Sequence, residues 1–166
     1  MSRLFAATAL LSIFVALPAQ AAAPACWSRE DIAAAKVRDL DMLLTEISAR
    51  CVAAGLSSSA DYDAYAVVSR GALSAVGQRL KARFWTVYGA EQGPARLDGF
   101  LDAVSGQYAH VPTVDENCAQ VAELAREAVS AGGSVVALLG VADRHNLTPP
   151  LSGGACGAQP VKVAAR

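Results

Sequence analysis

Aromatic residues make up only 6% of this 166-residue chain, and histidine occurs only twice. The chain also lacks the C-x-x-C, C-x-x-C-H, G-x-G-x-x-G and G-x-S-x-G patterns. These absences argue against a redox-active thiol pair, an attached c-type haem, a dinucleotide-binding loop and the serine elbow of α/β hydrolases. No cysteine lies beside a histidine at the spacing of zinc ligands, so we expect no metal site and no cofactor.

The net charge of the chain is close to zero, because it contains 14 basic and 15 acidic residues. Nucleic-acid-binding domains carry a clear excess of basic residues, so no nucleic-acid partner is expected. Beyond the N-terminus no uncharged apolar run reaches the roughly 20 residues that a membrane-spanning helix needs. We therefore expect no membrane span in the mature form.

The N-terminus has the pattern of a secretory signal peptide over residues 1–21. Arg3 precedes an uncharged run over residues 4–17, Pro18 interrupts that run, and Ala19-Gln20-Ala21 places small residues where a signal peptidase reads the chain. The sequence therefore predicts an exported protein. An uncleaved N-terminal anchor is the less favoured alternative, since the run is shorter than a bilayer requires.

Apolar residues recur every three or four positions through most of the remaining chain, which predicts amphipathic helices. Ser28, Ser58 and Thr113 are each followed three residues later by a carboxylate, as in a capping box at a helix start. The expected helices lie at residues 29–54, from about 60 to 88, from Pro94 to about 109, from the cap at Thr113 to Gly132, and in a short segment opened by Ser134.

These segments predict an all-α fold. We expect residues 22–148 to form an up-and-down helical bundle of four main helices plus a short buried fifth, stapled by two disulfides. The fifth is expected to be buried because residues 135–141 leave almost no polar face. Residues 149–166 contain Pro-Pro and Gly-Gly pairs without periodicity, and we expect a coil tail anchored by Cys156.

The four cysteines predict two disulfides in an oxidising compartment. If residues 29–54 form one helix, Cys26 and Cys51 lie roughly 35 Å apart along a rod that rises 1.5 Å per residue. A disulfide needs its Cα atoms within about 7 Å, so that pairing and its complement are excluded. In an up-and-down layout the end of the first helix lies beside the start of the fourth, which predicts Cys51 with Cys118 and Cys26 with Cys156.

The most suggestive cluster for binding is Arg79, Arg83, Trp85 and Tyr88, near the end of the second predicted helix. Arg79 and Arg83 share a helix face, and cationic and aromatic side chains are enriched at interaction surfaces. The alternative, which we favour, is that the aromatic residues pack under the loop to Pro94 while the arginines are solvated.

Few residues suggest catalysis. His110 and His145 each lie at the predicted end of a helix, where a cation complements the helix dipole. A hydrolase would be favoured if either histidine lay beside a carboxylate in a polar pocket, and disfavoured if both lay on exposed ridges. The acidic residues Asp39, Asp41 and Glu46 are interpreted as a solvated face, because they lack the Glu-x-x-His partners of a di-iron bundle.

An ordered set of short motifs resembles small exported four-cysteine proteins of Gram-negative bacteria, a family without an established activity. The set spans nearly the whole mature chain: Cys26-Trp27, Ala33 to Leu44, Arg50-Cys51, Leu80 to Trp85 with Tyr88-Gly89, Cys118, Ala131 to Gly133, and Gly153 to Gly157. Some members of that family are named adenosylhomocysteine hydrolase. This chain has neither the βαβ pattern nor the glycine-rich loop of that NAD enzyme.

Together these features favour an exported, disulfide-stabilised helical protein of the cell envelope, located in the periplasm or secreted. We expect a non-enzymatic module that binds an unknown protein or small-molecule partner. A small secreted hydrolase without a recognisable motif is the alternative.

Overall fold

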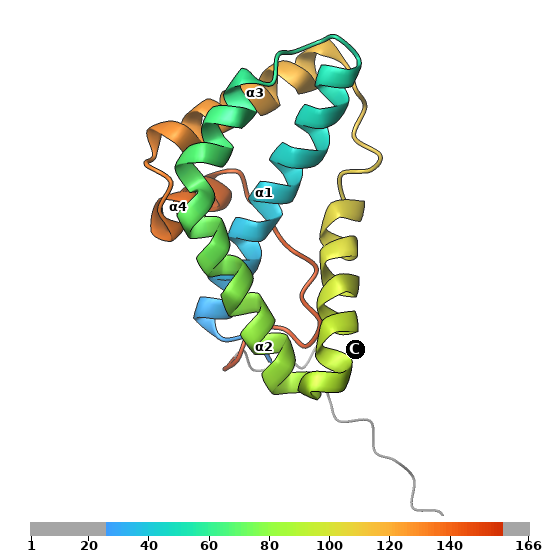
Figure 1. Ribbon diagram of the computed structural model, residues 1–166, viewed down its shortest axis with the longest axis vertical. Coiled ribbons are helices and arrows are strands. Elements are labelled where there is room, and N and C mark those ends of the chain that lie inside the picture. The colour runs from blue at the N-terminus through green and yellow to red at the C-terminus, as the bar shows by residue number, and fades with distance from the viewer. Residues whose placement is uncertain (1–25, 158–166) are drawn as a thin grey trace, which may run out of the picture.

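The computed structural model describes residues 26–157 as an all-helical domain (Figure 1). Its helices are α1 (Arg29–Ala53), α2 (Ala60–Gly106), α3 (Asp115–Ser130) and α4 (Val135–Arg144). The all-α prediction is confirmed for this part of the chain. The predicted signal peptide and the last nine residues of the predicted tail lie outside the described residues.

Helix α1 occupies the centre of the domain and packs against each of the other three helices. It begins as predicted at Ser28, whose hydroxyl accepts a hydrogen bond from the Asp31 amide at 3.1 Å. Its apolar seam is fully buried at Val37, Leu40 and Leu44. The core of the domain is therefore built around α1.

Helix α2 is bent sharply at Gly89, whose φ of 75° and ψ of 172° are not helical. Figure 1 shows the two arms of α2, residues 60–88 and 90–106, running in opposite directions. They correspond to the second and third predicted helices. The prediction of four helices plus a fifth is wrong for the described residues, because the chain reverses at one glycine and resumes its helix without a loop.

The bend is compact because Gly93 has no side chain. A Cβ atom at Gly93 would lie 3.1 Å from the Trp85 ring and 3.2 Å from the Phe84 carbonyl. The second arm can therefore begin directly against the end of the first, with Pro94 in its opening turns.

Helices α3 and α4 differ from the prediction in two details. The N-cap residue of α3 is Val114 and not Thr113, and no side-chain hydrogen bond caps the start of this helix. The hydroxyl of Ser134 does cap α4, since it accepts from the Ala137 amide at 3.2 Å. The prediction that this last helix is buried is wrong for one face: Leu138 is fully buried but Val136 is 80% exposed, because only one side of α4 packs on the other helices.

The two disulfides lie at opposite ends of α1. Cys51 pairs with Cys118, with a Cα–Cα distance of 5.7 Å, and Cys26 pairs with Cys156, with a Cα–Cα distance of 4.8 Å. These are the two pairs predicted from the length of the first helix and an up-and-down layout. Over residues 26–157, no helix combines the length and the apolar character that crossing a membrane requires.

Candidate functional site

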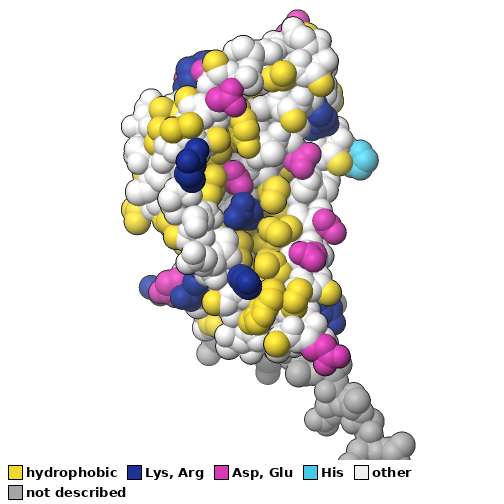
Figure 2. Space-filling view, in the orientation of Figure 1, with side chains coloured by type: hydrophobic (Ala, Val, Ile, Leu, Met, Phe, Trp, Pro, Cys, Tyr) yellow, Lys and Arg dark blue, Asp and Glu magenta, His cyan; other side chains and the backbone are white. Residues whose placement is uncertain are grey.

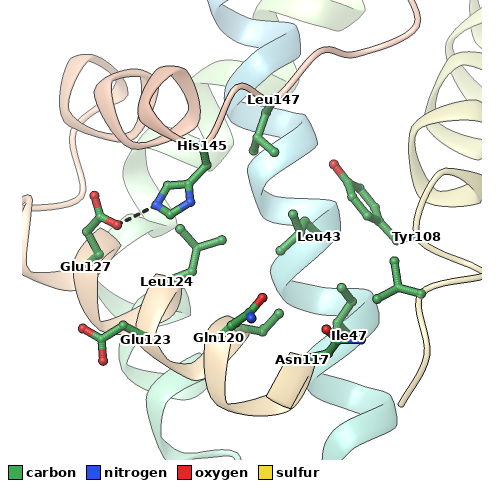
Figure 3. A pocket seen from close by; sticks show the side chains of 12 residues that line it. Leu43, Ile47, Tyr108, Asn117, Gln120, Glu123, Leu124, Glu127, His145 and Leu147 are labelled. Carbon is green, nitrogen blue, oxygen red and sulfur yellow. Dashed lines mark hydrogen bonds and ion pairs between the residues drawn. The ribbon is translucent and has the colours of Figure 1, made fainter. Parts of the chain in front are cut away.

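A cavity of about 510 Å³ opens between α1, α3 and two segments that connect or follow helices, residues 108–111 and 145–147. Figure 3 shows its layout, with Leu43 and Ile47 of α1 between the α3 side chains and Tyr108. Half of the lining is aliphatic, which makes the cavity suitable for an apolar molecule. The aliphatic lining residues are Leu43, Ile47, Val111, Val121, Leu124 and Leu147.

Arg50 holds the wall that residues 108–111 form. Its guanidinium donates hydrogen bonds to the carbonyl oxygens of Tyr108 at 2.7 Å, Ala109 at 3.2 Å and Val111 at 3.0 Å. These carbonyls lie beyond the C-terminus of α2, and that of Tyr108 also accepts a hydrogen bond from the Val111 amide at 3.2 Å. The adjacent Cys51 is bonded to α3, so the wall and α3 are both fixed to the same turn of α1.

A buried carboxyl group lies behind the cavity. Asp39 is 1% exposed and accepts hydrogen bonds from the Tyr108 hydroxyl at 2.5 Å and from the Gln107 amide at 3.4 Å. Burial raises the pKa of Asp39, and the hydrogen bond from Tyr108 offsets only part of that rise. The Tyr108 ring is therefore held in place between the carboxyl group and the cavity.

The acidic residues of α1 are not the solvated face that the sequence predicts. Asp41 is 8% exposed; burial raises its pKa although it is paired with Arg38 at 2.7 Å. Glu46 accepts a hydrogen bond from Ser105 at 2.8 Å. This prediction was wrong because α2 and the residues directly after it cover the α1 face that carries these carboxylates, and their side chains supply hydrogen-bond partners.

Polar side chains of α3 form one wall of the cavity (Figure 3). The side-chain nitrogen of Asn117 donates to the Pro112 carbonyl at 2.9 Å, and that of Gln120 donates to Glu116 at 3.4 Å. These bonds occupy one N–H of each amide and leave its oxygen free to face a ligand. Asn117, Gln120 and Glu123 follow one another at intervals of three, so they lie on adjoining turns.

His145 and Glu127 meet at one end of the cavity, with 2.7 Å between Nε2 and Oε2. The other Glu127 oxygen accepts two hydrogen bonds from Arg144, at 2.8 and 2.6 Å. The bonds from His145 and then Arg144 lower the pKa of Glu127, outweighing its slight burial. His110, by contrast, is exposed and does not line this cavity.

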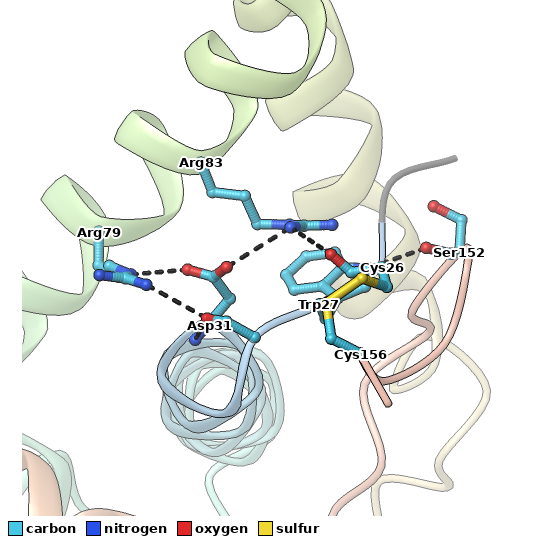
Figure 4. Close-up of a disulfide and its surroundings, with 8 residues drawn as sticks. Cys26, Trp27, Asp31, Arg79, Arg83, Ser152 and Cys156 are labelled. Atoms are coloured by element: carbon cyan, nitrogen blue, oxygen red, sulfur yellow. Dashed lines mark hydrogen bonds and ion pairs between the residues drawn. A yellow bond between two sulfur atoms is a disulfide. The ribbon is translucent and has the colours of Figure 1, made fainter. Parts of the chain in front are cut away.

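The predicted binding residues Arg79 and Arg83 hold the start of α1 (Figure 4). Arg79 forms a 2.6 Å ion pair with Asp31, and Arg83 lies 3.5 Å from the other oxygen of the same carboxylate. Arg83 also donates to the Cys26 carbonyl at 3.1 Å and lies 3.7 Å above the centre of the Trp27 ring. The expectation that both arginines are solvated is wrong for Arg83, whose side chain is 6% exposed.

Asp31 is the electrostatic centre of this contact. Burial alone raises its pKa, but the hydrogen bonds from Arg79 and Ser28 and the charges of Arg79 and Arg83 outweigh burial, so the net pKa is lowered. The carboxylate therefore stays ionised and bound to both arginines at neutral pH.

Trp85 and Tyr88 make separate contacts. Trp85 packs against Gly93 at the α2 bend. The Lys81 Nζ atom lies over the Trp85 ring, 5.2 Å from the ring centre. Tyr88 stacks on Phe84 with ring centres 5.8 Å apart. The binding surface proposed from Arg79, Arg83, Trp85 and Tyr88 stays a prediction, while each of the four has a packing or ion-pair contact of its own.

Other surfaces offer less to a ligand. A second cavity of about 370 Å³ borders the Trp27 ring beside the tail. Figure 2 shows apolar side chains gathered along the middle of one face, between the two arms of α2. Within residues 26–157, no three His, Cys, Asp or Glu side chains are grouped as metal ligands.

No protein-family model, no curated protein and no solved structure matches this chain. The resemblance to exported four-cysteine proteins therefore stays a prediction.

Proposed function

We propose that the protein is an exported, disulfide-stabilised helical protein of the cell envelope that binds a small apolar molecule in the cavity between α1 and α3. The cavity carries this proposal. Its volume of about 510 Å³ lies in the range of small-molecule sites, and it combines an aliphatic lining with a few convergent polar groups. Arg50 and the Cys51–Cys118 disulfide fix two of its walls, so little ordering is needed on binding.

Export is supported by the cysteines and by the N-terminal sequence. All four cysteines are paired, and disulfides persist mainly outside the reducing cytosol. The leader pattern over residues 1–21 agrees with that compartment. We place the protein in the periplasm or the external medium, as the resemblance to proteins of Gram-negative bacteria implies.

The arrangement of the helices that we propose is an up-and-down bundle in which α1 and the two arms of α2 alternate in direction. Support comes from the reversal at Gly89 and from the packing of both α2 and α3 on α1. In this arrangement the cavity lies between α1 and α3.

The test uses the neutral apolar dye N-phenyl-1-naphthylamine, whose fluorescence rises in an apolar site. We expect saturable binding of one dye per protein. Gln120→Trp places a large side chain at the cavity wall and should weaken binding at least about tenfold, since displaced apolar contact area is lost. Gln78→Trp, on an exposed turn of α2 away from the cavity, is the matched control and should bind as the wild type does.

Both variants are first compared by circular dichroism to confirm that they fold. Binding that does not saturate, or equal binding by Gln120→Trp and wild type, would rule the cavity out as the ligand site.

A small secreted hydrolase is the second candidate, and the His145–Glu127 pair is the observation that favours it. A histidine oriented by a carboxylate can act as a general base toward water. Against it, the lining holds no serine, threonine or cysteine as a nucleophile, and Arg144 already binds Glu127. Hydrolysis of p-nitrophenyl butyrate that is lost in His145→Gln and kept in His110→Gln would establish it; equal rates in all three proteins would remove it.

A further inference from the structure

We propose that the cavity between α1 and α3 selects an organic cation, a medium-sized molecule with an apolar body and an ammonium group. This inference rests on the proposed function, because it specifies the ligand of the same site. It follows from the charges and the hydrogen-bonding capacity of the lining residues.

The first observation is the sign of the charges in the lining. Glu123 and Glu127 both line the cavity, whereas no lysine or arginine does. Arg144 approaches Glu127 but is not itself a lining residue. An anionic ligand would meet two carboxylates without a lining lysine or arginine, while a cation would meet charges of opposite sign.

The second observation is the excess of acidic groups along α3. This helix carries four acidic residues and one basic residue, Arg126. Arg126 is divided between two carboxylates, because it pairs with Glu123 at 2.7 Å and with Asp61 of α2 at 2.7 Å. One guanidinium therefore serves two carboxylates, and it neutralises the charge of Glu123 only in part.

The third observation is the kind of polar atom that the wall presents. The side-chain oxygens of Asn117 and Gln120 and the Oε1 atom of Glu123 accept no hydrogen bond from the residues that the structure describes. All three are acceptors, and they lie on adjoining turns of α3. An ammonium group has three donors and no acceptor, so it can bind to all three oxygens, whereas a carboxylate can accept only from the second N–H of each amide.

The apolar part of the ligand has a place opposite this wall. Leu43 and Ile47 project from α1 between the α3 wall and Tyr108 (Figure 3). A molecule that lies across the cavity can thus pack an alkyl or aryl body on α1 and direct its cationic end to the acceptors of α3.

The experiment compares three probes with the same chain, octylammonium, 1-octanol and octanoate, as competitors of bound N-phenyl-1-naphthylamine. We expect octylammonium to compete about 2- to 5-fold better than octanol, as one exposed ion pair allows, and octanoate to be the weakest. The advantage of octylammonium should shrink in high salt, and the affinity of octanol should not.

Two variants locate the effect. Glu123→Gln removes one lining carboxylate and should bring octylammonium close to octanol, without changing octanol binding. Glu91→Gln makes the same change on an exposed part of α2 and should leave the preference unchanged. Glu127 is left intact because it holds Arg144 and His145.

The outcomes separate the two proposals. Equal competition by all three probes overturns the selection for a cation and leaves the binding function standing. A preference that survives in Glu123→Gln overturns the placement of the cationic end at the α3 wall. Tighter binding of octanoate than of octylammonium also overturns it. A dye that never binds overturns the binding function, and the selection for a cation with it.

Discussion

Individual carboxyl groups of α1 show how local surroundings decide the behaviour of one residue type. Asp31 is paired with two arginines and its pKa is lowered, whereas Asp39 is buried beside a phenol and an amide and its pKa is raised. The difference lies in the partners: guanidinium groups stabilise the ionised form more than neutral donors do. The sequence shows only aspartates on a helix, so neither environment could be predicted before α2 was placed.

Replacing Asp39 by asparagine should change how stability depends on pH. Because burial raises the folded-state pKa of Asp39, the folded state binds that proton more tightly than the unfolded state. The contribution of Asp39 to stability is therefore present below its unfolded pKa of about 3.9 and is lost as pH rises through the folded pKa. Asp39→Asn still accepts from Tyr108 and removes this loss.

We expect the free energy of unfolding of Asp39→Asn, relative to wild type, to increase between pH 4 and pH 7. Urea denaturation at several pH values measures this difference. Asp31, whose pKa is lowered, makes stability rise with pH in the wild type and in Asp39→Asn alike, so its effect cancels in the difference between them. Asp98→Asn, which makes the same change at an exposed carboxyl of the second arm of α2, serves as the control. A difference in free energy of unfolding that is flat or decreases with pH would contradict a raised pKa for Asp39 in the folded state.

At the scale of helices, periodicity predicted the segments well and the capping residues less well. Ser28 and Ser134 cap α1 and α4 through their hydroxyls, as expected. Thr113 has the same spacing to a carboxylate, yet α3 starts one residue later without a side-chain cap. The chain before α3 is fixed instead by Arg50 and by the Cys51–Cys118 disulfide, and these tertiary contacts outweigh a local preference.

The bend of α2 depends on the backbone conformation of one residue, Gly89. Gly89 combines a positive φ with an extended ψ, a region that is accessible almost only to glycine. Gly89→Ala should therefore destabilise the protein by about 1 to 3 kcal/mol. Gly71→Ala is the matched control in the first arm, since a Cβ there meets nothing within 4 Å, and it should stabilise by about 0.5 to 1 kcal/mol.

Urea midpoints for the two alanine variants give both values. Opposite signs for the same chemical change would attribute the effect to the backbone conformation at Gly89. Equal effects would show that the bend does not depend on glycine.

At the scale of the whole molecule, the disulfides fix the two ends of α1, and the cavity lies between them. The pairing could be predicted because one long helix separates Cys26 from Cys51 by a distance that no disulfide spans, and the expected up-and-down layout chose between the two remaining pairings. The cavity could not, because its walls come from α1, α3 and segments near residues 108 and 145, which are far apart in sequence. Helix periodicity shows which side of a helix is apolar but not where two apolar sides fail to meet.

The two disulfides should differ in their resistance to reduction. Cys51 and Cys118 are 1% and 2% exposed, whereas Cys26 and Cys156 are both exposed at the surface. Thiol–disulfide exchange requires an attacking thiolate to reach a sulfur atom, so access controls the rate. A mild reductant should therefore open Cys26–Cys156 well before Cys51–Cys118.

Alkylation of the freed thiols at successive times, followed by peptide mass spectrometry, measures the order of opening. The same reaction in concentrated urea is the control, because unfolding exposes both bridges and should bring their rates together. The tail keeps two backbone hydrogen bonds to Trp27, at 2.8 and 2.9 Å, after the first bridge opens, so the folded core should persist at that stage. Opening of Cys51–Cys118 first, or loss of helical circular dichroism together with the first bridge, would contradict a core that is held independently of the tail.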